Sequence, residues 1–117
     1  MGRLSTHVLD TALGKPAAGM VIRLYRVSGT SHKKIATVTT NADGRTDAPL
    51  LSGDDLTAGV YELVFCAGDY LRTTGQAGEG IAFLDEIPIR FGVPDAGAHY
   101  HVPLLISPFA YSTYRGS

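Results

Sequence analysis

The chain has 117 residues, the length of one ordinary domain built around one hydrophobic core. Its 10 Lys and Arg residues nearly balance its 11 Asp and Glu residues, so a formal net charge of -1 leaves no basic footprint for nucleic acid. A single cysteine excludes an internal disulfide and any zinc site made of several cysteines. We therefore expect one domain over residues 1–117 with no nucleic-acid partner.

The sequence also lacks the marks of a membrane or secreted protein. No apolar run approaches the roughly 20 residues of a membrane-spanning helix, and the first residues lack the apolar segment of a signal peptide. We therefore expect no membrane association and a cytoplasmic location. Cys66 lies in an apolar, strand-like run, which favours a small buried side chain.

Short segments of alternating apolar and polar residues run through the whole chain, separated by turn signals. They predict strands over residues 4–10, 20–27, 33–40, 60–66, 87–93, 100–107 and 109–115, and a shorter one over 46–51. The one predicted helical turn covers residues 69–74. Seven or eight short strands with almost no helix are typical of an all-β, antiparallel sandwich.

The first predicted strand carries a histidine on its less apolar face. Leu4, Thr6 and Val8 alternate with Ser5 and His7, so the face with the apolar pair is the expected core face. The strand over residues 100–107 repeats this arrangement, with an apolar core face made by Tyr100, Val102, Leu104 and Ile106. In both strands the imidazoles therefore point away from the expected core.

These histidines are candidates for proton transfer. Imidazole is the side chain whose ordinary pKa, about 6.5, lets it exchange protons near neutrality. Two alternatives stay open. The histidines are solvated surface residues, or the period-two spacing of His99 and His101 presents two ligands to a zinc ion, with His7 as a third.

A tight turn is predicted at Asn41-Ala-Asp-Gly44, because Asn and Asp bond nearby backbone and Gly accepts a positive φ. Arg45 follows directly and offers a planar donor fork suited to an anionic or carbonyl-rich ligand, unless it is a solvated loop arginine. The sequence contains neither a Gly-x-Ser-x-Gly nucleophile elbow nor a phosphate-binding Gly-x-x-x-x-Gly-Lys loop.

Four motifs together resemble the 5-hydroxyisourate hydrolases, the transthyretin-related enzymes of urate breakdown, nearly end to end. They are Leu4-Ser-Thr-His-Val-Leu-Asp-Thr11 with Gly14-Lys-Pro-Ala17, Asn41-Ala-Asp-Gly-Arg45, Gly97-Ala-His-Tyr-His-Val-Pro-Leu-Leu105, and Tyr114-Arg-Gly-Ser117. The resemblance implies a transthyretin-like sandwich of two four-stranded sheets with one short helix. It also implies a homotetramer, a dimer of dimers, with sites where the dimers meet.

The resemblance further implies hydrolysis of 5-hydroxyisourate at its lactam C–N bond, without a metal or a cofactor. The implied catalytic residues are His7, Arg45, His101 and Ser117, and the implied substrate-binding residues are Tyr114, Arg115 and Gly116. A neutral histidine of the pair would activate water and Arg45 would stabilise the oxyanion, while the choice of histidine stays open.

Two other functions are compatible with such a fold. A transthyretin-like carrier of small molecules of the thyroid-hormone type would bind ligand without catalysis. The resemblance implies that carriers lack the set of His7, Arg45, His101 and the terminal Tyr114-Arg-Gly-Ser117 motif, all of which this sequence has. An adhesive or structural sandwich would be monomeric and indifferent to replacement of both histidines.

Overall fold

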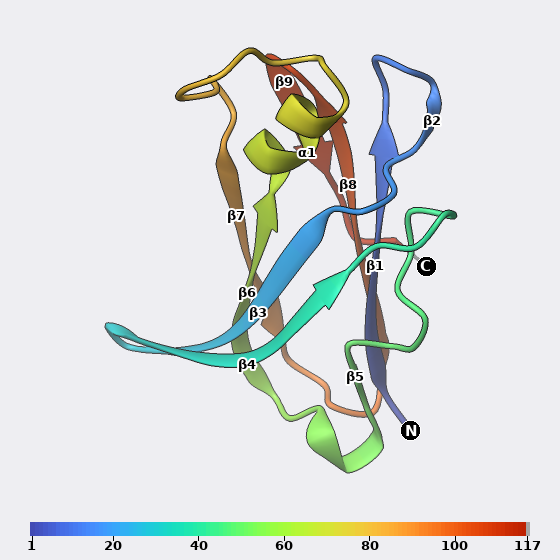
Figure 1. The fold of residues 1–117 in the computed structure, drawn as a ribbon. Helices are drawn as coiled ribbons and strands as arrows, with labels where there is room; N and C mark the ends of the chain where they lie inside the picture. Colours follow the sequence, from blue (N-terminus) through green and yellow to red (C-terminus); the bar gives the residue numbers. More distant parts are fainter. Residues whose placement is uncertain (117) are drawn as a thin grey trace.

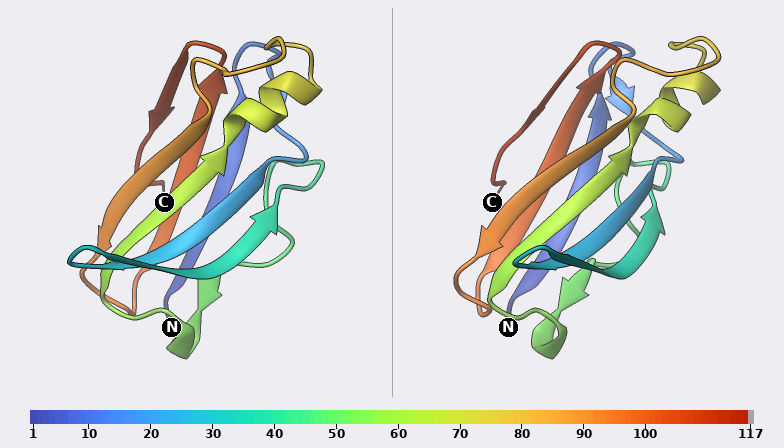
Figure 2. Two further views of the ribbon diagram at one scale, coloured as in Figure 1. Left: turned by 60° about the vertical axis from the view of Figure 1, so that its left-hand side comes forward. Right: turned by 90° about the vertical axis from the view of Figure 1, so that its left-hand side faces the viewer.

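The computed structural model describes residues 1–116 and consists of two β-sheets packed face to face (Figure 1). The first sheet contains β1 (Arg3–Asp10), β2 (Lys15–Pro16), β5 (Leu51–Ser52), β8 (His99–Ser107) and β9 (Ala110–Thr113). The second contains β3 (Val21–Ser28), β4 (Ser31–Thr39), β6 (Gly59–Cys66) and β7 (Glu86–Val93). The helix α1 (Ala67–Thr73) covers one end of the sandwich, and a 3₁₀ turn, η1 (Gly53–Asp55), lies at the other (Figure 2).

The predicted all-β sandwich with one short helix is confirmed, and two details are corrected. The sheet that holds β1 has five strands instead of four, because the two-residue strands β2 and β5 both pair with β1. The sandwich is also not wholly antiparallel, because β1 and β8 run parallel. A parallel pair needs a crossover connection, and here the whole second sheet lies between the two strands in the sequence.

The inner faces of β1 and β8 are those predicted from the alternation. Leu4 and Val8 are at most 1 % exposed, and Leu104 and Ile106 are fully buried. Burying each such side chain contributes about 1.5–3 kcal/mol. Thr6, the polar residue on this face, donates a hydrogen bond from its hydroxyl to the carbonyl of Val102, so no polar atom is left unpaired there.

A buried carboxylate joins the end of β1 to the helix. Asp10 is fully buried, and it accepts hydrogen bonds from the hydroxyl of Tyr70 (2.6 Å), the side-chain amide of Gln76 (2.8 Å) and the backbone N–H of Leu13 (2.9 Å). Burial alone would raise the pKa of Asp10, but these hydrogen bonds outweigh it and hold the pKa below its ordinary value. This network fixes α1 over the end of the sandwich.

Cys66 is buried at the end of β6, as predicted, and burial raises the pKa of its thiol. Within residues 1–116, no helix is long and apolar enough to cross a membrane.

Candidate active site

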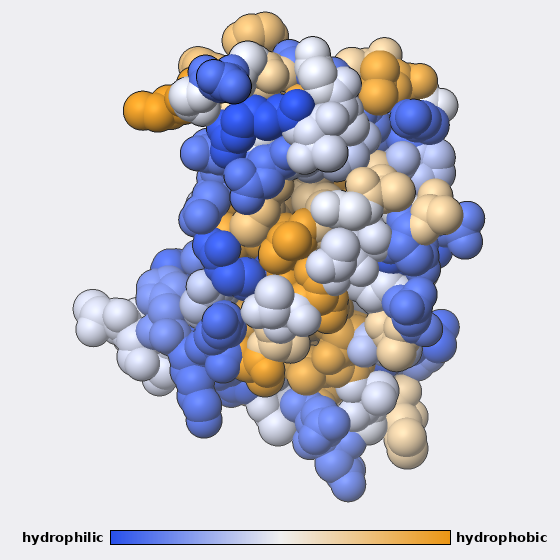
Figure 3. All heavy atoms as spheres, viewed as in Figure 1, coloured by the Kyte–Doolittle hydropathy of each residue, from blue (hydrophilic) through white to orange (hydrophobic). Residues whose placement is uncertain are grey.

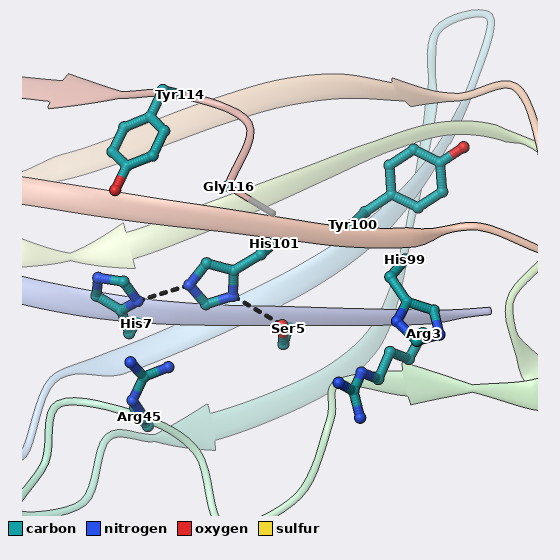
Figure 4. A pocket seen from close by; sticks show the side chains of 9 residues that line it. All are labelled: Arg3, Ser5, His7, Arg45, His99, Tyr100, His101, Tyr114 and Gly116. Carbon is teal, nitrogen blue, oxygen red and sulfur yellow. Dashed lines mark hydrogen bonds between the residues drawn. The ribbon is translucent and has the colours of Figure 1, made fainter.

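A cavity of about 420 Å³ lies on the outer face of β1 and β8, where the sequence places the histidines (Figure 4). Its lining is mostly polar. The residues around it are Arg3, Ser5, His7, Arg45, His99, Tyr100, His101, Tyr114 and Gly116. The cavity therefore brings together residues that are up to 113 positions apart in the chain.

The parallel register of β1 and β8 creates the histidine pair. Ser5 lies opposite His101, and His7 lies opposite Pro103, so the two imidazoles occupy diagonal positions on one face. Nδ1 of His7 and Nε2 of His101 form a hydrogen bond of 2.6 Å, with ring centroids 4.7 Å apart. Figure 4 marks this hydrogen bond with a dashed line. Because the bond joins the two rings, the protonation of one imidazole depends on that of the other, and we call the pair a proton-sharing unit.

Ser5 extends this unit. Its Oγ lies 2.7 Å from Nδ1 of His101, so both ring nitrogens of His101 are hydrogen-bonded. Sequence reasoning missed Ser5, because a serine on the outer face of a strand carries no signal until the register places it opposite His101.

The predicted turn holds Arg45 beside the pair. Oδ1 of Asn41 accepts hydrogen bonds from the backbone N–H groups of Asp43 and Arg45, and Gly44 adopts φ +72°. A Cβ at Gly44 would clash with the carbonyl oxygen of Val8, so this close approach requires glycine. The turn thereby docks on β1, where Arg45 forms a β-bridge with His7.

The guanidinium of Arg45 has no hydrogen bond or ion pair with any other of the 116 described residues, and it faces the cavity. An unpaired guanidinium beside two imidazoles is suited to an oxyanion or a polarised carbonyl.

Both imidazoles are held in the neutral form. Burial lowers the pKa of His7, and the positive charge of Arg45 lowers it further. Burial also lowers the pKa of His101, with added contributions from His7 and Arg45. At neutral pH the pair therefore consists of uncharged rings, which is the state that accepts a proton.

The residues near the end of the chain divide between two places. Tyr114 lines the cavity, and the backbone N–H of Gly116 donates a hydrogen bond of 2.7 Å to the carbonyl of His101. A Cβ at Gly116 would lie 2.7 Å from Cδ2 of His101, so only glycine fits against the ring. Ser117 lies outside the described residues, and its predicted role stays a prediction.

Arg115 points elsewhere. Its guanidinium lies over the ring of Tyr100, 4.6 Å from the centroid, and donates a hydrogen bond to the carbonyl of His99. It is not among the residues that line the cavity.

His99 does not join the histidine pair. Its Nε2 lies 3.0 Å from the carbonyl oxygen of Met1, and it occupies the strand position opposite Arg3. Among residues 1–116 there is no group of three or more His, Cys, Asp or Glu side chains placed to hold a metal ion. The facing nitrogens of His7 and His101 bond each other, so the geometry favours proton transfer over a zinc site.

Comparison with known proteins agrees with this geometry. The sequence model described as HIUase/Transthyretin family matches residues 4–116. A protein of Mesorhizobium japonicum named 5-hydroxyisourate hydrolase is 65 % identical over 116 residues, covering 99 % of this chain and 93 % of that protein.

Two solved structures are also similar. The structure of Klebsiella pneumoniae 5-hydroxyisourate hydrolase matches with a TM-score of 0.81 and 37 % identity over the full length of both chains. A crystal structure of (S)-allantoin synthase matches with a TM-score of 0.92 and 46 % identity; the match covers 99 % of this chain but spans 44 % of that one.

Proposed function

The chain belongs to the HIUase/Transthyretin family, and we propose that it is an enzyme that hydrolyses 5-hydroxyisourate to 2-oxo-4-hydroxy-4-carboxy-5-ureidoimidazoline. The observation that carries this proposal is the neutral, hydrogen-bonded pair of His7 and His101 beside the guanidinium of Arg45, with which no side chain of residues 1–116 pairs. These groups line one polar cavity, of a size suited to a flat, heteroatom-rich purine derivative.

The reaction breaks the lactam C–N bond of the substrate. A neutral imidazole of the pair takes a proton from water as the water oxygen bonds to the carbonyl carbon. Arg45 stabilises the negative charge that develops on the carbonyl oxygen. When the tetrahedral intermediate collapses, the imidazolium returns its proton to the leaving nitrogen, and a carboxyl group and a free N–H are formed.

The general base and the oxyanion donor each contribute a typical share of the rate. A positioned general base contributes about 10²–10⁴-fold in rate. An oxyanion donor contributes about 2.7–4 kcal/mol. In this scheme no step uses a metal or a cofactor.

The residues of the Tyr114 to Ser117 motif have separate proposed roles. Tyr114 contacts the substrate from the wall of the cavity, and Gly116 keeps His101 in place through the backbone bond to its carbonyl. Arg115 holds Tyr100 and the backbone of His99, so any contact with the substrate is indirect in a single chain. Ser117 orders the water or an imidazole.

A transthyretin-like carrier is the alternative function. A hormone-type ligand would be favoured by an apolar channel, whereas this cavity presents three imidazoles, two guanidinia and two phenols among its lining groups. The polar lining therefore supports catalysis over simple binding.

We also propose that the enzyme assembles as a homotetramer of two dimers. The edge strands β7 and β9 flank an apolar-lined cavity of about 210 Å³, and edge strands of this kind pair readily with a second copy. Phe83 and Phe109 are 74 % and 76 % exposed, and Figure 3 shows apolar residues at the surface in the middle of the molecule. Light scattering should report four copies of the 12.4 kDa chain, and a monomer would contradict the assembly.

The proposed reaction is tested by generating 5-hydroxyisourate in place with urate oxidase and following its decay with and without this protein. Acceleration that survives EDTA is expected for a metal-free hydrolase. Acceleration that EDTA abolishes would instead support the alternative of a zinc site formed by His99, His101 and His7. The cytoplasmic location stays a prediction.

A further inference from the structure

A continuous chain of hydrogen bonds crosses from β1 to β8 and back to β1. Ser5 Oγ bonds Nδ1 of His101 at 2.7 Å, and Nε2 of His101 bonds Nδ1 of His7 at 2.6 Å. The remaining ring nitrogen, Nε2 of His7, has no partner within residues 1–116. Figure 4 shows it turned away from His101.

His7 lines the cavity, and Nε2 is the one nitrogen of the pair without a hydrogen-bond partner among residues 1–116. Every other nitrogen of the pair is occupied by another side chain.

Two proton arrangements satisfy both hydrogen bonds when the rings are neutral. In the first, Ser5 donates to His101, His101 donates from Nε2 to His7, and His7 carries its proton on Nε2. In the second, His101 donates from Nδ1 to Ser5, His7 donates from Nδ1 to His101, and Nε2 of His7 keeps a lone pair. Only the second leaves a base facing the cavity.

The charge of Arg45 selects between them. A guanidinium beside His7 disfavours an N–H and favours a lone pair on the nitrogen that faces the cavity. We propose that Ser5 is a positioning residue: its oxygen accepts Nδ1–H of His101 and so leaves the lone pair of the unit on Nε2 of His7, which removes the proton from the attacking water. The choice of tautomer is argued from the two hydrogen bonds and the charge of Arg45, and the catalytic step rests on the proposed function.

The pair gains and then loses one proton in each hydrolysis. Nε2 of His7 takes the proton as the water oxygen bonds to the carbonyl carbon, and the resulting imidazolium keeps donating from Nδ1 to His101. Ser5 keeps accepting from His101 and neither gains nor loses a proton overall. The proton on Nε2 of His7 then passes to the leaving nitrogen, which restores the neutral pair.

Nitrogen-15 NMR of the imidazole rings tests the arrangement without any substrate. The spectra are recorded at about pH 8, where ordinary imidazoles are neutral. Among residues 1–116, the charged or titratable groups that line the cavity with the pair are Arg45 after β4, Tyr114 after β9, Tyr100 in β8, and Arg3 and His99 at the starts of β1 and β8. The expected result is a proton on Nδ1 of both rings and a lone pair on Nε2 of His7.

Ser5→Ala should move the proton of His101 from Nδ1 toward Nε2, and the proton of His7 toward its own Nε2. Finding the proton of the unaltered protein already on Nε2 of His7 would overturn the proposal. Ring shifts that do not change in Ser5→Ala would also overturn it.

Turnover gives the second readout. Ser5→Ala should lower kcat about 10-fold, the loss expected for one hydrogen bond that positions His101, with KM within about 2-fold. Ser5→Thr keeps the hydroxyl and should restore kcat, and Ser31→Ala, an exposed strand serine of the other sheet, should match the unaltered protein.

A folded Ser5→Ala protein with unchanged kcat would contradict the positioning role. If the unaltered protein does not turn over 5-hydroxyisourate, the proposed function fails, and the NMR result still decides the hydrogen-bond arrangement.

Discussion

Gly116 offers a sharp test of how closely the site depends on the placement of one ring. In Gly116→Ala the new Cβ would lie 2.7 Å from Cδ2 of His101, where 3.4 Å is an ordinary contact. The imidazole or the backbone near Gly116 must therefore move by roughly 0.7 Å, which displaces a ring held by hydrogen bonds of 2.6 and 2.7 Å. Since a misplacement of about 1 Å can cost 10²-fold in rate, we expect kcat to fall about 100-fold.

The assay is the decay of 5-hydroxyisourate under saturating substrate, with the melting temperature measured in parallel. The melting temperature should change little, because the three atoms nearest to the new Cβ all belong to His101, which is not part of the hydrophobic core. Gly78→Ala is the matched control, since a Cβ there meets no atom within 4 Å. A folded Gly116→Ala protein with the kcat of the control would refute the claim that the position of His101 limits the rate.

Three further predictions follow from the same geometry. Arg45→Gln should lower kcat by about 100-fold, equivalent to about 2.7 kcal/mol of oxyanion stabilisation. It should also raise the pKa of the histidine pair, because the nearby positive charge is gone. A pKa that stays the same or falls would contradict the proposed effect of the Arg45 charge. Because the pKa of His7 and His101 is lowered in the folded protein, kcat/KM should stay constant through neutral pH and fall only below about pH 6.5. Below that pH the unfolded chain binds more protons than the folded protein. The free energy of unfolding that urea denaturation measures should therefore also decrease as the pH drops. Tyr70→Phe removes a hydrogen bond to the buried carboxylate of Asp10 and should lower the free energy of unfolding by about 1.5–3 kcal/mol. It should leave kcat unchanged, because the Asp10 network lies outside the cavity. A loss of activity without a loss of stability would contradict this.

The sequence predicts the faces of the strands well, because alternation depends only on neighbouring residues. His7 and His101 were expected on outer faces, and the structure places both there around one cavity. The turn that presents Arg45 was also predictable, since Asn41 and Gly44 act through local backbone bonds and a positive φ.

The pairing of strands was not predictable in the same way. The parallel contact of β1 with β8 joins segments almost a chain length apart, and no local pattern records which distant strand is the neighbour or in which direction it runs. A strand of two residues is too short to show a periodicity, so β2 was missed, and the strand predicted over residues 46–51 overlaps β5 only at Leu51.

Ser5 and Arg115 show the same limit at the level of single side chains. Ser5 gains its role from the register that places it opposite His101. Arg115 belongs to a motif whose neighbours reach the cavity, yet its guanidinium packs on Tyr100, an arrangement that depends on how the segment after β9 returns along β8. The resemblance supplies the motif, and only the structure shows the direction of each side chain.

The role of the histidine pair is tested by the turnover of 5-hydroxyisourate by His101→Ala and His7→Ala, each shown to be folded and assembled like the unaltered protein. We expect rapid turnover by the unaltered protein and a loss of at least about 100-fold in both variants, because each variant lacks one of the two hydrogen-bonded imidazoles. Near-normal turnover by either folded variant would contradict the claim that the histidine pair activates the water.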